Sequence, residues 1–442
     1  MNKRGISTVA VVGIIIVILV VAAVGIYVVT RPSPAPTVFE YDMLTASPAA
    51  FTWGEDVTVS VNVTNPATTE VTGNVTIVLN GAVTLKKTET LAANETRTVK
   101  FTFSNGTYTA PGPYTVTIPG TTIQNTFTVK EIARVGLVLA TGGLGDKSFN
   151  DLSYSGVVKA SQELGIAFDF VEPKSTTEYE GIQRDFARSE KYEIIICIAF
   201  DQNESLTIVA GEYPNQKFAI VDMYCPRSNV ASLLFKANEG SFLVGVAAGM
   251  MTKTGKVGFV GGMEIDLIED FFVGYEAGAE WANSTVQVVT PVYVGGWADP
   301  TKGKELAIGL IDAGVDAIFV AAGKSGLGAL EAAHDRGILG LGVDACQCYL
   351  YPEIKASMTK RVDLAVSRII EAALKGTFAG GVISGGLKEH LVGACRLPEE
   401  QPHWEATFGF IHPSLEAAVI SKMDEARDKI VNGEITVPSA FG

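Results

Sequence analysis

The chain has 442 residues, which is too long for one hydrophobic core and predicts two or three domains. Its 34 Lys and Arg residues against 48 Asp and Glu residues give a formal net charge of −14. This charge argues against a nucleic-acid-binding protein, which needs a basic face to neutralise phosphates. A hydrophobic content of 47% excludes a largely disordered chain.

The first predicted element is a transmembrane helix that serves as a membrane anchor within residues 1–30. The run Val9–Val29 is apolar and uncharged and has about the ~20-residue length needed to cross a bilayer core. Because Lys3 and Arg4 precede it, we expect the short N-terminal end to stay in the cytoplasm and the rest to lie outside the cell. No cysteine precedes Cys197, so a lipid anchor is not expected. A cleaved secretory signal and an archaeal pilin-like signal remain open as alternatives.

A Pro-rich linker at residues 31–37 leads into a segment of different character at residues 38–130. There, short runs alternate apolar residues with Thr or Asn and are separated by turn residues, which predicts a small antiparallel sandwich. The pattern resembles immunoglobulin-like spacer domains of surface proteins, and we interpret it as a stalk. Six asparagines begin N-x-[ST] sequons and are candidate glycosylation sites: Asn62, Asn74, Asn94, Asn105, Asn203 and Asn283.

Residues 133–442 change to apolar strands that alternate with helical stretches, which predicts parallel sheets joined by right-handed crossovers. The number of strands indicates two Rossmann-like lobes rather than one sheet. The expected strands are 135–140, 194–199, 217–221, 257–260, 286–293, 317–321 and 339–343. The expected helices include 152–165, 241–251, 302–313 and 326–336.

The segment 134–156 has the pattern expected of a ligand site. An apolar strand is followed by a turn that contains Gly142, Gly143 and Gly145, and a helix begins after Ser148. This order places polar groups at the carboxyl edge of a parallel sheet, where ligands bind in open α/β folds.

Eight strings within residues 133–442 resemble the basic membrane protein family, which comprises substrate-binding proteins of ABC importers. The strings are GDKSFND, YPNQKFAIVD, AAGMMTKTGKVGFVGGME, FFVGYEAGA, WADPTKGKELA, LGVDACQ, ASMTKRVDLAV and KIVNGEITVP. The best-known members of the family are purine nucleoside receptor lipoproteins. The resemblance implies a type I periplasmic-binding-protein fold with the ligand between two lobes, and an ABC permease with its ATPase subunit as partners.

The resemblance also implies which residues hold the ligand. Phe149 and Phe271 match family positions that stack on the two faces of a purine, and Phe272 is the alternative to Phe271. Asp344 matches the acid that accepts the ribose hydroxyls, and Lys360 matches the lysine beside it. The full set of candidate ligand-binding residues is Asp146, Phe149, Asn150, Asp201, Phe271, Trp297, Asp344 and Lys360.

Two of these candidates flank the first ring and offer groups for the edge of a base. Asn150 carries both a donor and an acceptor, and Asp146 can accept from an exocyclic amine. Asn150 could instead cap the following helix. Family members often have two consecutive acids here, whereas this chain has Gly145 before Asp146. Asp299 is a further residue that could line the cleft.

The cysteines suggest a crosslink close to the site. Cys197 lies in an apolar run and is interpreted as a buried small hydrophobe. The other four, in a chain that faces an oxidising exterior, are candidates for one or two disulfides: Cys225, Cys346, Cys348 and Cys395. We expect a bridge from Cys346 or Cys348 to Cys225 or Cys395, with a C-x-C metal site as the alternative.

Other chemistries find little support. The string GGLGDKS lacks the third glycine of a dinucleotide fingerprint, and the sequence contains neither a Walker A motif nor a G-x-S-x-G elbow. The four histidines show no metal-ligand spacing. We therefore predict a non-enzymatic solute receptor without cofactor or metal, which binds a nucleoside. The alternatives are a receptor for another small solute and a surface adhesion protein.

Overall fold

The computed structural model describes residues 38–52, 55–104, 111–395 and 416–441. The chain divides into two compact units at Ile132/Ala133, and each unit is considered by itself. The predicted anchor and linker (residues 1–37) lie outside the described residues, as does Asn105. None of the described helices is long and apolar enough to cross a membrane.

The first unit consists of two β-sheets. One sheet has the order β1 (Glu40–Ser47), β3 (Val57–Thr64), β6 (Thr96–Phe103). The other has the order β2 (Ala50–Thr52), β8 (Gln124–Lys130), β7 (Gly112–Thr117), β4 (Val71–Leu79), β5 (Val83–Leu91). Every second residue of β3, from Val57 to Val63, is fully buried, as the period-two pattern requires. Both sheets contribute to one apolar cluster.

The sequon asparagines lie in different surroundings. Asn62 on β3 and Asn74 on β4 each accept a cross-strand hydrogen bond from a threonine hydroxyl, and Asn94 lies in an exposed turn with φ 56°. Asn203 is the first residue of the helix α4 (Asn203–Glu212), and its side-chain oxygen is buried. Asn283 directly follows the helix α6 (Asp266–Ala282) and donates to the carbonyl of Gly249. Glycosylation at any of these positions stays a prediction.

The second unit contains two larger sheets. The first, in lobe 1, is entirely parallel, with the order β10 (Ala167–Val171), β9 (Arg134–Val138), β11 (Ile194–Ile198), β12 (Phe218–Val221), β13 (Val230–Phe235), β20 (Gly381–Gly385). The second, in lobe 2, has the order β15 (Gln287–Val288), β14 (Lys256–Gly261), β17 (Ala317–Ala321), β18 (Leu339–Gly342), β19 (Ile354–Lys360), β21 (Val392–Cys395). In addition, β16 (Val292–Tyr293) pairs with β14, and β21 is antiparallel to β19.

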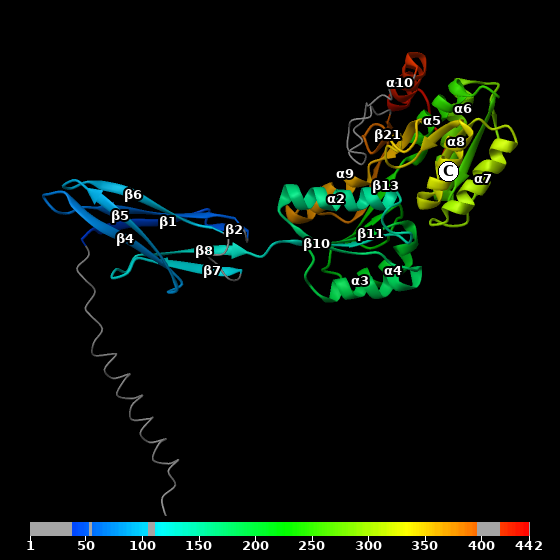
Figure 1. Ribbon diagram of the computed structural model, residues 1–442. Helices are drawn as coiled ribbons and strands as arrows, with labels where there is room; N and C mark the ends of the chain where they lie inside the picture. The colour runs from blue at the N-terminus through cyan, green and yellow to red at the C-terminus, as the bar shows by residue number, and fades with distance from the viewer. Residues whose placement is uncertain (1–37, 53–54, 105–110, 396–415, 442) are drawn as a thin grey trace, which may run out of the picture. The chain divides into compact units, whose positions relative to one another are not determined.

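Helices cover both faces of each sheet. In lobe 1, α2 (Phe149–Leu164) and α9 (Val362–Leu374) pack together on one face, and α3 (Tyr179–Arg188) and α4 (Asn203–Glu212) lie on the other (Figure 1). In lobe 2, α5 (Ala237–Met251) packs on α6 (Asp266–Ala282), and α7 (Pro300–Asp312) packs on α8 (Gly323–Arg336). α10 (Ala417–Val431) packs on α5.

Strand β17 shows why its sequence is apolar throughout. Ala317 and Phe319 belong to the same apolar cluster as residues of α5 and α6, whereas Ile318 and Val320 cluster with residues of α7 and α8. A strand covered by helices on both faces has no solvent side, so the alternation of apolar and polar residues disappears.

Within the described residues of the second unit, the chain crosses between the lobes three times. The crossings follow β13, β19 and β20, since α5, α9 and β21 each pack in the lobe opposite to the strand before them. The segment after Arg361 is thereby shared between the lobes: α9 and β20 belong to lobe 1, and β21 and α10 to lobe 2.

The predicted strands correspond to β9, β11, β12, β14, β17 and β18. The expected strand 286–293 was wrong as a single element, because the structure divides it into the short strands β15 and β16. Strands β10, β13, β19, β20 and β21 were not predicted.

The packing of α5 on α6 depends on glycines. A Cβ atom added to Gly278 would lie 2.0 Å from the carbonyl oxygen of Phe242, and one added to Gly245 would lie 2.1 Å from that of Tyr275. We expect Gly278→Ala to lower the free energy of unfolding by roughly 1–3 kcal/mol, because backbone must move to admit the methyl group. Urea unfolding measures this change.

Gly309 in α7 provides the matched control. No atom lies within 4 Å of a Cβ added there, so Gly309→Ala should raise the free energy of unfolding by about 0.5–1 kcal/mol. Equal effects of the two substitutions would show that α5 and α6 do not approach closely.

Candidate functional site

A cavity lies between the two lobes. Its walls come largely from residues that follow the carboxyl ends of parallel strands in both sheets: the glycine loop after β9, the residues after β11, β12, β17 and β18, and the end of β19. One side of α6 completes the wall through Leu267, Ile268 and Phe271.

All eight candidate residues predicted from the sequence line this cavity: Asp146, Phe149, Asn150, Asp201, Phe271, Trp297, Asp344 and Lys360. Asp299 does not, because its carboxylate accepts a hydrogen bond from the backbone of Lys302 and caps α7. Contact of the eight residues with a ligand stays a prediction.

The structure gives Asp146 a role different from reading a base. Its Oδ1 accepts from the backbone N–H groups of Ser148 (3.0 Å) and Asp151 (3.2 Å). Its Oδ2 accepts from the backbone (2.8 Å) and the side-chain nitrogen (3.2 Å) of Asn150. Both oxygens are thus occupied at the start of α2, so Asp146 takes the capping role that the sequence analysis considered for Asn150, which lies inside the helix. Burial raises the pKa of this carboxyl.

Asn150 is also engaged within the protein. Its Oδ1 accepts from the backbone N–H of Ala140 at 2.9 Å, and its Nδ2 donates to Asp146. The pair therefore fixes the shape of the glycine loop relative to α2. Both side chains are thus engaged within the protein, and their contact with the edge of a base stays a prediction.

Asp344 lies just after β18, at the bottom of the site. Its backbone has φ 61°, a left-handed conformation that Asp and Asn tolerate better than most residues. Its Oδ2 accepts a 2.6 Å hydrogen bond from the hydroxyl of Ser148 in lobe 1. Burial raises the pKa of Asp344 to about 6, against the opposing effects of Lys360 and Ser148. A buried carboxylate with remaining acceptor capacity suits a hydroxyl-rich ligand.

Lys360 forms a buried ion pair that joins the lobes. Its ammonium lies 2.5 Å from Oδ2 of Asp222, and their side chains are 2% and 4% exposed. Lys360 is the last residue of β19 in lobe 2, whereas Asp222 follows β12 in lobe 1. This ion pair therefore forms only when the two lobes meet.

Aromatic rings surround the same ammonium. The ring centroids of Phe149, Phe235 and Phe271 lie 5.1, 5.2 and 5.4 Å from Nζ of Lys360. Phe149 comes from α2 in lobe 1 and Phe271 from α6 in lobe 2, so rings from opposite lobes border the cavity. Phe272, the alternative considered for Phe271, packs on Phe259 instead.

Asp201 offers the unused acceptor that Asp146 lacks. Its Oδ2 accepts from the hydroxyl of Tyr179 at 3.3 Å, while its Oδ1 is buried and has no hydrogen-bond partner. Burial raises the pKa of Asp201. Since a buried carboxylate oxygen is costly to leave unpaired, Oδ1 marks the place where a ligand donor would be most favourable.

Two further contacts cross between the lobes. The side chain of Gln347 donates to the backbone carbonyl of Lys147 at 3.1 Å. The ammonium of Lys324 donates to the carbonyl of Leu144 at 3.2 Å. The structure therefore shows the lobes in contact around the cavity.

The sequence analysis missed several residues that line the cavity, namely Asp222, Lys324, Phe200, Leu267 and Ile268. Asp222 and Lys324 closely follow the strands β12 and β17, so the rule that ligands bind at the carboxyl ends of parallel strands could have found them. Phe200 packs edge-on against Trp297, with centroids 6.4 Å apart.

The described cysteines form one disulfide, Cys346–Cys395, which is one of the pairings expected. The expectation was wrong for Cys225, which is a buried thiol near the hydroxyl of Thr207 in lobe 1. Cys197 is fully buried in β11, as predicted. Among the described residues, the one Cys, His, Asp or Glu group compact enough for a metal ion is Cys346, Cys348 and Cys395, and two of its sulfurs are already bonded.

Comparison with known proteins places this site in context. A family model described as "ABC transporter substrate-binding protein PnrA-like" matches residues 133–440. Basic membrane protein A of Borreliella burgdorferi is 35% identical over 321 residues, which cover 70% of this chain and 88% of the relative. An uncharacterized lipoprotein of Pyrococcus abyssi is 34% identical over 275 residues, which cover 59% of this chain and 68% of the relative.

Solved structures show the same fold. A solute-binding protein of an ABC transporter system from Aeropyrum pernix K1 superposes with a TM-score of 0.62 at 32% identity. The superposition covers 69% of this chain and 94% of that protein. The predicted periplasmic-binding-protein architecture of the second unit is therefore confirmed.

Proposed function

Because the chain belongs to the Bmp family of PnrA-like substrate-binding proteins of ABC transporters, we propose that it captures a purine nucleoside between its two lobes. It then delivers the nucleoside to a permease that is driven by an ATPase subunit. The chain acts as a binding protein and not as an enzyme. The observation that carries this proposal is the buried group of Asp344 and Lys360 beside phenylalanines from opposite lobes.

The polar end of the cavity suits a ribose. One carboxylate can accept from two vicinal hydroxyls, and Asp344 retains acceptor capacity beyond its bond from Ser148. Lys360 uses one of its three donors on Asp222 and can offer another to a sugar oxygen.

The apolar part of the cavity suits a flat heterocycle. Stacking of a base on an aromatic ring is worth about 1–3 kcal/mol by alanine substitution. Phe149 and Phe271 supply such rings, and Oδ1 of Asp201 supplies an acceptor for an N–H group of the base. Recognition of the base edge therefore rests on Asp201 in place of Asp146 and Asn150.

The contacts between the lobes explain how the ligand is held. The pairs Lys360–Asp222 and Ser148–Asp344 exist only when the lobes meet, and both border the cavity. A ligand that touches both lobes stabilises the closed state relative to an open one.

We further propose that the protein is exported and held at the outer face of the cell membrane. The apolar run Val9–Val29, outside the described residues, would serve as the anchor. Relatives from Pyrococcus abyssi and Pyrococcus furiosus are named lipoproteins. Cell fractionation followed by protease treatment of intact cells tests this location.

Thermal unfolding against a panel of nucleosides, bases, sugars and amino acids tests the ligand. A ligand at about 100 times its dissociation constant stabilises the native state by roughly 2.7 kcal/mol. We expect a rise in melting temperature with purine nucleosides. A rise with another solute alone would retain the receptor and reject the nucleoside, and no rise with any solute would favour an adhesion role.

Phe149→Ala tests the stacking ring directly. We expect the dissociation constant for a purine nucleoside to rise by about 5- to 150-fold, because one stacked face is lost. Calorimetry measures the change, and Phe272→Ala is the matched control because that ring packs on Phe259 outside the cavity. Unchanged affinity in Phe149→Ala would remove this ring from the site.

A further inference from the structure

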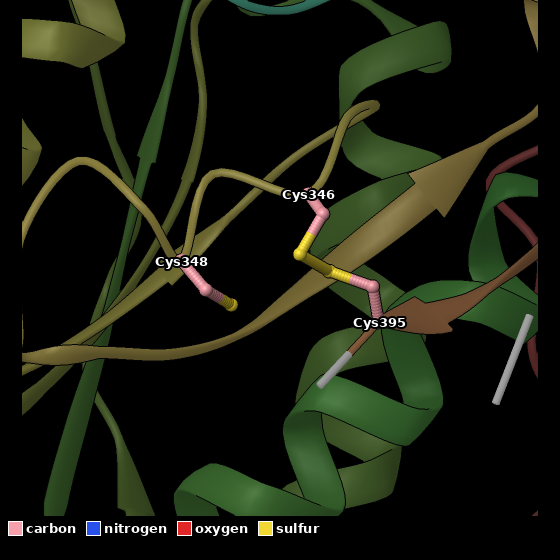
Figure 2. Close-up of side chains that lie close together, drawn as sticks. All are labelled: Cys346, Cys348 and Cys395. Carbon is pink, nitrogen blue, oxygen red and sulfur yellow. A yellow bond between two sulfur atoms is a disulfide. The ribbon is translucent and has the colours of Figure 1, made fainter. Parts of the chain in front are cut away.

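Three cysteines converge beside the ligand site in lobe 2. Cys346 and Cys348 lie on the loop between β18 and β19, and Cys395 ends β21 (Figure 2). Their sulfur atoms all lie within 4.8 Å of one another, and the residues are 0%, 7% and 1% exposed. Cys346 and Cys395 form the disulfide, and the thiol of Cys348 lies next to it.

The crosslinked loop carries two of the contacts that join the lobes. Asp344 accepts from Ser148, and Gln347, between the two loop cysteines, donates to the carbonyl of Lys147. The side-chain oxygen of Gln347 also accepts from the backbone of Val343 at 3.0 Å. The bond from Cys346 to β21 therefore fixes the short segment that positions both contacts.

Strand pairing holds the three sulfurs together independently of the bond. Cys395 is paired with Ser357 across the antiparallel strands β19 and β21. The hydroxyl of Ser357 accepts from the backbone of Gln347 at 3.0 Å and lies 4.0 Å from the sulfur of Cys348. Because both loop cysteines are presented to the same end of β21, either one can be the partner of Cys395.

We propose that these residues form a thiol–disulfide exchange site in which Cys348 can replace Cys346 as the partner of Cys395. The thiol of Cys348 loses its proton to solvent, and its thiolate attacks the sulfur of Cys395. The Cys348–Cys395 bond forms as the Cys346–Cys395 bond breaks, and the released Cys346 thiolate takes up a proton. No external oxidant or reductant is consumed.

The thiol–disulfide exchange changes which loop residue is covalently bonded to β21. With Cys348 as the partner, the bond lies beyond Gln347, so Cys346 and the neighbouring Asp344 lose their covalent tie to β21. We expect backbone amide exchange in the segment 343–347 to become about tenfold faster, since local opening is then easier. The choice of disulfide partner would thus control the mobility of the segment that carries Asp344 in the cavity wall.

Disulfide mapping of the full-length protein tests the proposal. Cys346→Ser is oxidised in a glutathione buffer at about pH 8 and digested without reduction, and its peptides are identified by mass spectrometry. We expect a Cys348–Cys395 crosslink. Cys348→Ser is the matched control and should retain Cys346–Cys395. Thiols at both Cys348 and Cys395 in the oxidised Cys346→Ser protein would overturn the proposal.

The wild-type protein provides a test that does not depend on folding of a variant. Samples incubated at increasing pH are quenched with acid and mapped without reduction. The Cys348–Cys395 isomer should accumulate about ten times faster for each pH unit below the pKa of the attacking thiol, because only the thiolate reacts. Detection of Cys346–Cys395 alone at every pH would also overturn the proposal. Neither test uses the nucleoside, so both are independent of the proposed function.

Discussion

Lys360→Met is expected to lower the free energy of unfolding by about 3–5 kcal/mol near pH 7.5. The substitution removes one member of a buried ion pair and leaves Asp222, with a side chain 4% exposed, without its compensating charge. Since most proteins of this kind are stable by only about 5–15 kcal/mol, the effect is a large fraction of the total. Urea unfolding at fixed pH measures it.

The double variant Asp222→Asn/Lys360→Met separates the unpaired charge from other effects. Replacing both partners by neutral groups should recover most of the lost stability, because Asp222 is then no longer a buried charge without its partner. The deficit of Lys360→Met should also shrink as pH falls, because burial raises the pKa of Asp222 and its carboxyl can take up a proton in the folded state. Equal deficits in the single and double variants would show that the ion pair is not the cause.

Asp344→Asn is expected to stabilise the ligand-free protein while weakening ligand binding. Burial raises the pKa of Asp344 from 3.8 to about 6. The folded state therefore retains a proton that the unfolded state releases, and stability falls as pH rises from about 4 to 6. Each pKa unit corresponds to about 1.4 kcal/mol, so Asn should raise the free energy of unfolding by roughly 3 kcal/mol above pH 6.

The gain should shrink as pH falls and vanish only below about pH 3, because the carboxyl is then protonated in both states. Asn is also suited to the backbone of residue 344, whose φ of 61° it tolerates as well as Asp does. The exposed Asp312 provides the control, since Asp312→Asn should show no comparable rise between pH 4 and pH 7. Thermal unfolding across this pH range measures both variants.

Ligand affinity should change in the opposite direction. A hydrogen bond to a charged group contributes about 1.5–3 kcal/mol, so Asp344→Asn should weaken binding of a purine nucleoside by about 10- to 150-fold. Wild-type affinity should likewise fall as pH drops through about 6, where the acceptor becomes protonated. Unchanged affinity in calorimetry would place the ribose away from Asp344.

The family and the architecture of the second unit could be predicted from the sequence. The family resemblance is confirmed, and the strands β9, β11, β12, β14, β17 and β18 were located correctly. These strands are short apolar runs that end in glycine or polar residues, so their pattern is local. Strands such as β13 and β19 were not predicted, because polar residues interrupt their apolar pattern.

The position of the candidate site could be predicted from the sequence, but the hydrogen bonds that its side chains make within the protein could not. The family resemblance, together with the glycine loop and polar residues after strands, led to eight candidates that all line one cavity. The pattern could not show that Asp146 is committed to the start of α2 or that Asp201 keeps an unpaired oxygen. The hydrogen-bond partners of these carboxylates depend on N–H and O–H donors whose positions are set by the folded chain.

By itself the sequence determined the change from a period-two pattern to alternating strands and helices near residue 133, and the residue types available at the strand ends. Only the tertiary structure decided that Lys360 pairs with Asp222, 138 residues away, and that Cys395 bonds to Cys346 and not to Cys225. It also divided the segment after Arg361 between the lobes. The physical reason is that hydrophobic periodicity is encoded within a few residues, whereas partners across the cleft depend on strand order in two sheets linked by three crossings.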